Sequence, residues 1–128
     1  MTKPKVEIEN FDIETELRCR CGCGRYNYDT EFLIRLQAFR YILGKPLTVT
    51  GGGRCIKHNA DEGGVDTSCH QCETKKATAV DVTNNNCLEL YKKACDSQLF
   101  NEVILYERKN FVHLGLDKKQ KGNYFSKV

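Results

Sequence analysis

Three residues in the middle and last third of the chain carry side chains that bind zinc in enzymes. His70 lies in a polar stretch, Asp81 in a short apolar run, and His113 in a second apolar run further along. Imidazole nitrogen and carboxylate oxygen are common zinc ligands, and three protein ligands leave a fourth position open for water. We therefore predict a catalytic Zn²⁺ site made by His70, Asp81 and His113, where water becomes acidic enough to yield hydroxide near neutral pH.

Two charged residues are predicted to assist at this site. Arg54 follows three consecutive glycines, which favours close backbone packing and leaves the guanidinium pointing into a cleft. There it would bind a substrate carboxylate or polarise the scissile carbonyl. Glu107 begins a polar turn that leads to His113, and it is our candidate for the carboxylate that carries a proton from water to the leaving amine. The glycines do not form a phosphate-binding loop, because no helix with Lys-Ser/Thr follows them.

The eight cysteines of the chain allow several interpretations. Cys19, Cys21 and Cys23 alternate, so an extended segment would place all three on one face. Such a face would join Cys55 or Cys69 in a tetrahedral thiolate site. Local disulfides and buried free thiols explain the same residues.

The elements that must position these residues follow from the apolar periodicity. A helix is predicted between the N-cap Asp29-Thr30 and Gly44, which supplies the C-terminal cap. A second helix is predicted from Cys87 to about Ser97. Apolar residues at three- and four-residue intervals form the buried stripe of the first helix, and they are Phe32, Leu33, Leu36, Phe39, Ile42 and Leu43.

Short apolar runs bounded by turn residues predict the strands. These runs are Leu47–Thr50, Thr78–Thr83, Val103–Tyr106 and Phe111–Leu116, and Val6, Ile8, Phe11 and Ile13 suggest a further edge strand. Cys55–Ser68 is predicted to be a polar loop, and the residues after Leu116 a polar tail. The predicted fold class is α+β: an antiparallel sheet with two helices against one face, and zinc in a cleft on the other.

Composition limits the classes of partner. At 128 residues the chain is predicted to be a single domain, with its core at about residues 17–116. A net charge of +3 is too small to indicate nucleic-acid binding, and no apolar run is long enough for membrane insertion. The first 18 residues lack the apolar region of a signal peptide. We expect a monomer that is cytoplasmic at synthesis.

The order of motifs resembles the zinc D-Ala-D-Ala carboxypeptidase superfamily, especially its short phage-type members, which share their fold with the hedgehog signalling domain. The matching segments span about residues 17–116, and they are Cys19–Gly24, the first helix, Gly51–Cys55, His58-Asn59, Gly63-Gly64, Ser68–His70, Ala79–Asp81 and Phe111–His113.

This resemblance implies that His70, Asp81 and His113 are zinc ligands, that Arg54 binds substrate, and that Glu107 is the carboxylate beside the metal-bound water, as in hedgehog-type members. The implied activity is cleavage of peptidoglycan stem peptides by a zinc metallopeptidase, a DD-carboxypeptidase or an endopeptidase. A small member without a leader suits a phage or prophage endolysin that a holin-type route releases to the cell wall.

The chain departs from the family pattern between its first two ligands. His70 and Asp81 are further apart than in the family, so an insertion lies in the loop Gln71–Lys76. It brings Cys72 near His70, where a thiolate would cap the zinc, although a flexible loop cysteine is the simpler interpretation. Asn110 replaces the carboxylate that some carboxypeptidases have three residues before the last ligand.

Two other functions fit the same residues. One is a catalytically inactive zinc-binding module of the same fold, such as a virion component, which the inserted loop favours. The other is a cysteine-rich module whose metal site is formed by the thiolates. His58 is expected to have a hydrogen-bonding role.

Overall fold

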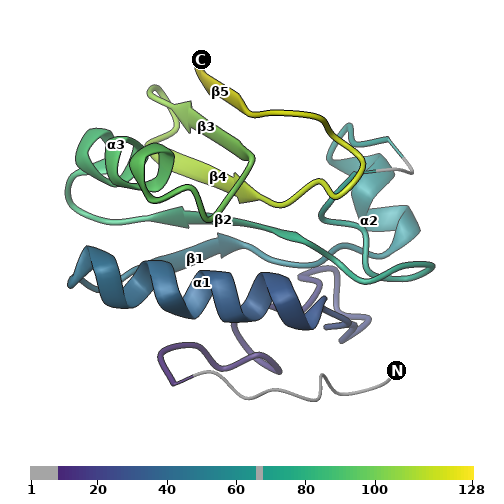
Figure 1. Ribbon diagram of the computed structural model, residues 1–128. Coiled ribbons are helices and arrows are strands. Elements are labelled where there is room, and N and C mark those ends of the chain that lie inside the picture. The colour runs from purple at the N-terminus through teal and green to yellow at the C-terminus, as the bar shows by residue number, and fades with distance from the viewer. Residues whose placement is uncertain (1–8, 66–67) are drawn as a thin grey trace.

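The computed structural model describes residues 9–65 and 68–128, and it contains a five-stranded sheet with helices packed against it (Figure 1). The strand order is β1-β2-β4-β3-β5. The strands are β1 (Thr48–Gly51), β2 (Ala79–Thr83), β3 (Glu102–Tyr106), β4 (Phe111–Gly115) and β5 (Tyr124–Lys127), and the helices are α1 (Thr30–Leu43), α2 (Ile56–Asp61) and α3 (Cys87–Ser97). The predicted α+β class is confirmed.

The two faces of the sheet have different chemistry. Side chains alternate along a strand, so Val80 and Val82 of β2 join the hydrophobic core while Asp81 points the other way. Buried residues of α1 and α3 pack in the same core. The opposite face carries polar residues and lines a pocket. The two predicted helices therefore cover one face, and the candidate site lies on the other.

The first helix begins and ends where its capping residues predict. The side chain of Asp29 accepts a hydrogen bond from the backbone N–H of Phe32, and Gly44 adopts a left-handed φ of 67°. A residue with a side chain is strained in that conformation, which explains the glycine. The predicted apolar stripe is buried except for Ile42, whose side chain faces solvent.

Three segments differ from the prediction. The loop Cys55–Ser68 contains the short helix α2, which lies apart from α3 (Figure 1). The predicted polar tail contributes β5, which pairs parallel with β3, so the sheet is not entirely antiparallel. Phe11 and Ile13 are buried in the core without forming a strand. Val6 and Ile8 lie outside the described residues.

Among the described residues, no helix is long and apolar enough to cross a membrane.

Candidate metal centre and pocket

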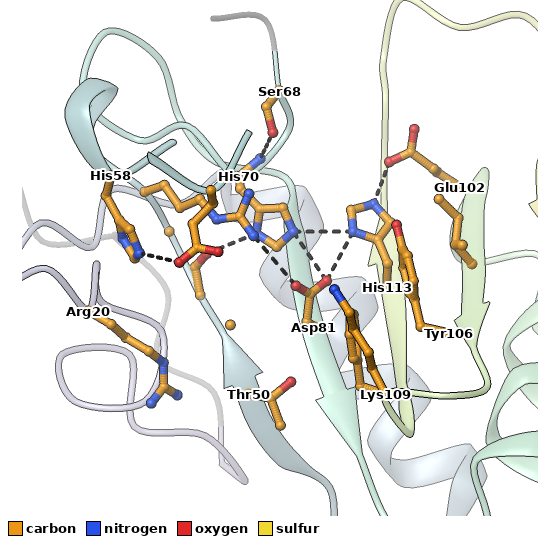
Figure 2. A pocket seen from close by; sticks show the side chains of 17 residues that line it. Arg20, Thr50, His58, Ser68, His70, Asp81, Glu102, Tyr106, Lys109 and His113 are labelled. Carbon is orange, nitrogen blue, oxygen red and sulfur yellow. Dashed lines mark hydrogen bonds and ion pairs between the residues drawn. The ribbon is translucent and has the colours of Figure 1, made fainter. Parts of the chain in front are cut away.

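Three predicted ligand atoms meet at the base of a pocket on the polar face of the sheet (Figure 2). His70 Nε2 lies 3.2 Å from Asp81 Oδ1 and 3.2 Å from His113 Nδ1. His113 Nδ1 lies 3.1 Å from the same oxygen of Asp81. The three atoms therefore form a nearly equilateral triangle.

This triangle fits a tetrahedral zinc ion. Zn–N and Zn–O bonds of about 2.0–2.1 Å place neighbouring donors about 3.3–3.4 Å apart, close to the distances between His70, Asp81 and His113. The distal nitrogens of both imidazoles are occupied: His70 Nδ1 lies 2.9 Å from the carbonyl oxygen of Gly52, and His113 Nε2 bonds Glu102 Oε1. Because both partners are acceptors, the distal nitrogens donate, so each ring in its neutral form has the lone pair of its inner nitrogen available for a metal.

Strand pairing brings two of the ligands together. Asp81 of β2 and His113 of β4 are direct cross-strand partners, and side chains of such pairs point to the same face. His70 comes from the segment before β2, where its carbonyl oxygen accepts a hydrogen bond from the Arg54 backbone N–H at 2.7 Å. Gly51 lies so close to Asp81 that a Cβ there would stand 2.9 Å from Oδ2. This glycine makes room for the carboxylate.

The charges around the triangle favour a cation at its centre. Burial by itself would lower the pKa of His113, but hydrogen bonds to Asp81 and Glu102 raise it to about 9. Burial would raise the pKa of Asp81, but the two histidines hold it well below its usual range. The hydrogen bond from His113 also lowers the pKa of Glu102. A divalent cation bound between His70, Asp81 and His113 would replace the proton that His113 otherwise holds.

Glu102 is the functional residue that the sequence reasoning missed. In the β3–β4 hairpin, Ile104 lies opposite His113, and Glu102 is two residues before Ile104, on the same face. Its carboxylate therefore reaches the distal nitrogen of His113. A polar turn that begins at Glu107 and ends at Asn110 places Ile104 opposite His113. Counting two residues back along β3 would therefore have identified Glu102 from the sequence.

We expect Glu102→Gln to weaken zinc binding by about tenfold to hundredfold, the usual cost of losing an outer hydrogen-bond partner of a metal ligand. The amide would still contact His113 but would not supply the negative charge. A competition titration with a chromophoric chelator measures the affinity. The matched control is Glu89→Gln, which alters a carboxylate that pairs with Lys45 on the surface. Equal affinities for Glu102→Gln and the unmodified protein would contradict the assigned role.

Arg54 lies where the sequence predicted it, beside the candidate metal ligands. Its Nη2 atom is 3.8 Å from Asp81 Oδ2, and its side chain is 19% exposed in the pocket. The close backbone packing of the glycines is also found: a Cβ on Gly52 would lie 2.4 Å from the carbonyl oxygen of Leu17. The guanidinium is therefore anchored near the metal ligands and reachable by a substrate.

Glu107 is not brought to the pocket. Its side chain is exposed and does not line the cavity, although Tyr106 and Lys109 of the same hairpin do. Among the described residues, the pocket is lined by three carboxylates: Asp81, Glu102 and Glu62, which follows α2. Glu62 Oε1 lies 3.3 Å from His58 Nε2. Glu102, rather than Glu107, is the carboxylate that lies beside the ligands.

The inserted loop Gln71–Lys76 does not close the site. Cys72 is buried in the hydrophobic core and is not part of the metal-ligand cluster, so its thiol does not cap the ion. It is not a flexible loop cysteine either, because its side chain packs against Gly53. Backbone N–H groups of Glu73 and Thr74 donate to the Gln71 side chain. No residue of this loop lines the pocket of about 750 Å³.

The comparisons with known proteins agree with this geometry. The family model described as peptidase M15 matches residues 9–115, which includes all three candidate ligands, Arg54 and Glu102. No curated protein matches the chain at a significant level.

Proposed function

The chain belongs to the M15 peptidases, a family of zinc metallopeptidases, and on that premise we propose that it hydrolyses amide bonds in the stem peptides of peptidoglycan. The observation that carries the proposal is the convergence of His70, Asp81 and His113 at the base of an open pocket, with Arg54 at its side. The reaction is a carboxypeptidase or an endopeptidase cleavage, at a D-Ala-D-Ala or an L-Ala–D-Glu type bond.

The two histidines and the three carboxylates considered below each have a part in this proposal. Bound zinc would polarise the scissile carbonyl and activate a water. His70, Asp81 and His113 hold the ion, and Glu102 fixes the orientation of the His113 ring. Glu62 is the pocket carboxylate that neither holds nor orients a ligand, and we assign to it the transfer of a proton to the leaving amine.

The charge of the pocket suits a substrate that carries carboxylates. Arg20, Arg54 and Lys109 balance the three carboxylates of the pocket, so a bound divalent ion would make the pocket positive overall and raise the local concentration of anionic ligands. Stem peptides of peptidoglycan carry free carboxylates next to the amide bonds that peptidases cut. Arg54, the cation beside Asp81, would bind the carboxylate nearest to the scissile bond.

We expect Arg54→Ala to lower kcat/KM on a carboxylate-bearing peptide by about tenfold to hundredfold, because a hydrogen bond to a charged group contributes about 1.5–3 kcal/mol. Steady-state kinetics with the substrate and with its C-terminal amide separates the causes. The loss is expected to be large for the free carboxylate and small for the amide. Equal losses on both substrates would contradict carboxylate recognition by Arg54. Zinc content should stay unchanged.

The function is tested by incubating the purified, zinc-loaded protein with sacculi of different peptidoglycan chemotypes. Newly released amines, followed by mass spectrometry of the fragments, report cleavage and identify the bond. The protein with Asp81→Asn serves as the inactive reference. If no chemotype is cleaved while zinc is bound, the chain is the alternative: a non-catalytic zinc-binding module of the same fold, such as a phage virion component.

We further propose that the protein acts as a monomer, because one chain supplies all three ligands and Arg54. Its biological setting would be phage-induced lysis, with a holin-type route bringing it to the cell wall. Size-exclusion chromatography with light scattering tests the first point, and lysis of cells after co-expression with a holin tests the second.

A further inference from the structure

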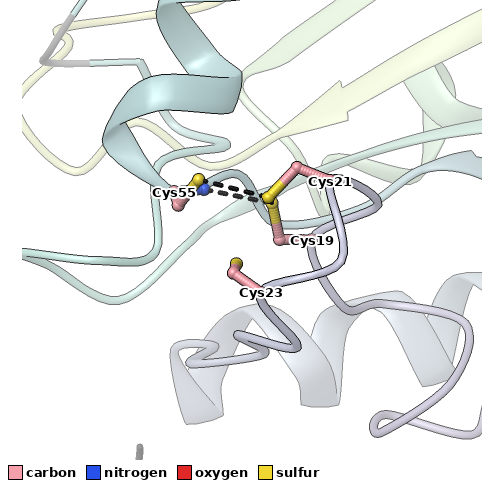
Figure 3. Close-up of side chains that lie close together, drawn as sticks. All are labelled: Cys19, Cys21, Cys23 and Cys55. Carbon is pink, nitrogen blue, oxygen red and sulfur yellow. Dashed lines mark hydrogen bonds between the residues drawn. The ribbon is translucent and has the colours of Figure 1, made fainter.

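Four cysteines converge at a second place, between the N-terminal segment and α2. Cys19, Cys21 and Cys23 come from one loop, and Cys55 immediately precedes α2. Their sulfur atoms all lie within 4.8 Å of one another. Figure 3 shows the four side chains directed at a common point. Cys69, the alternative to Cys55 that the sequence suggested as the fourth ligand, is absent from this cluster and lines a different cavity.

The spacing of the sulfurs fits a tetrahedral metal site. Cys21 Sγ lies 3.4 Å from Cys19 Sγ and 3.5 Å from Cys55 Sγ. Zn–S bonds of about 2.3 Å place neighbouring sulfurs about 3.8 Å apart, whereas a disulfide needs about 2.05 Å. All four are free cysteines. A tetrahedral set of four thiolates suits zinc or iron, and zinc is the usual ion of structural Cys₄ sites.

The backbone shapes the loop around this point. Gly22 and Gly24 have φ angles of 100° and 76°, conformations that L-residues with side chains rarely adopt. They turn the chain after Cys21 and again after Cys23, so the sulfur atoms of Cys19, Cys21 and Cys23 come close together without an extended segment. Gly22 and Gly24 therefore allow the backbone conformation that brings the three thiols together.

Nitrogen donors surround the sulfurs. The backbone N–H of Cys55 donates to Cys19 Sγ at 3.3 Å, and the N–H of His58 donates to Cys55 Sγ at 3.3 Å. His58 Nδ1 lies 3.2 Å from Cys19 Sγ, which is the hydrogen-bonding role expected for this histidine. Outer hydrogen bonds of this kind orient the ligands of a metal and stabilise the negative charge of thiolates.

We propose that Cys19, Cys21, Cys23 and Cys55 hold a structural zinc ion, separate from the ion in the pocket. Four thiolates leave no open position, so this ion has no catalytic role. It joins the N-terminal loop to the turn that carries Arg54, where the Gly53 N–H already donates to the carbonyl oxygen of Leu17 at 2.8 Å. The ion would therefore stabilise the backbone next to Arg54, a residue that lines the pocket.

Metal stoichiometry and cobalt spectroscopy test the proposal. The reduced protein should contain two zinc ions per chain by mass spectrometry of the metal content. Cys21→Ser, at an exposed position that is easily accommodated, should leave one ion, and so should His70→Ala. In the protein reconstituted with Co²⁺, thiolate-to-cobalt charge-transfer bands in the near ultraviolet should be lost with Cys21→Ser and kept with His70→Ala.

The matched control is Cys95→Ser, which removes a thiol on α3 that does not belong to the cluster. It should keep two zinc ions and the full charge-transfer bands. One zinc per chain in the unmodified protein, lost with His70→Ala, would overturn the proposal. So would a cobalt spectrum without thiolate bands, a measurement that needs no variant to fold. Because these readouts do not involve hydrolysis, they are independent of the peptidase activity.

Discussion

Asp81→Asn is expected to remove one zinc equivalent per chain and to reduce amide hydrolysis to background. The substitution keeps the shape of the side chain but removes the charge that both histidines contact. Losing only an outer partner of a metal ligand costs about tenfold to hundredfold in affinity, so losing a ligand itself should cost more. Without the ion, the pocket has no group that polarises the scissile carbonyl.

Metal content, zinc affinity and peptide hydrolysis are measured on the same preparations. Asp61→Asn is the matched control, because it makes the same chemical change at an exposed position of α2 outside the pocket. Thermal unfolding with and without added zinc gives an independent readout: zinc should raise the melting temperature of the control more than that of Asp81→Asn. If Asp81→Asn retained full zinc affinity, Asp81 would not be a ligand.

The helices α1 and α3 and the candidate ligand set could be predicted because their signals are local. Asp29 and Gly44 are capping residues that need only their own neighbours to act. His70, Asp81 and His113 stand out by residue type, and the order of motifs around them indicated the family that the match over residues 9–115 confirms. Their convergence agrees with the prediction. That they bind zinc stays a prediction until metal content is measured.

Features that depend on long-range pairing were harder to predict. β5 has only four residues, and it pairs parallel with β3 across an intervening strand and a polar segment. The helix α2 begins at a cysteine N-cap, a residue that is not among the usual caps. The place of Cys55 in the thiol cluster is evident only from the structure, where Cys55 lies beside Cys19 and Cys21. Local patterns did not contain this information.

The assignment of the carboxylates shows the same limit in the candidate site. Glu107 was predicted to be the proton-carrying carboxylate because of its position before His113 in the sequence. In the structure its side chain is exposed to solvent. Glu102 is further from His113 in the sequence yet contacts its ring, because the strand register places it there. Glu62 lines the pocket because α2 forms in a segment predicted to be irregular.

Glu62→Gln is therefore expected to lower kcat by about 10²- to 10⁴-fold, the usual contribution of general acid–base catalysis, with little change in zinc content. Glutamine keeps the size of the side chain and a contact to His58 but cannot take up a proton. Glu107→Gln is the decisive comparison, because it makes the same change in a carboxylate outside the pocket. Its kcat should stay within about twofold of the unmodified enzyme. A loss of catalysis in Glu107→Gln, with Glu62→Gln fully active, would return the proton transfer to Glu107 and require the β3–β4 turn to fold over the pocket when substrate binds.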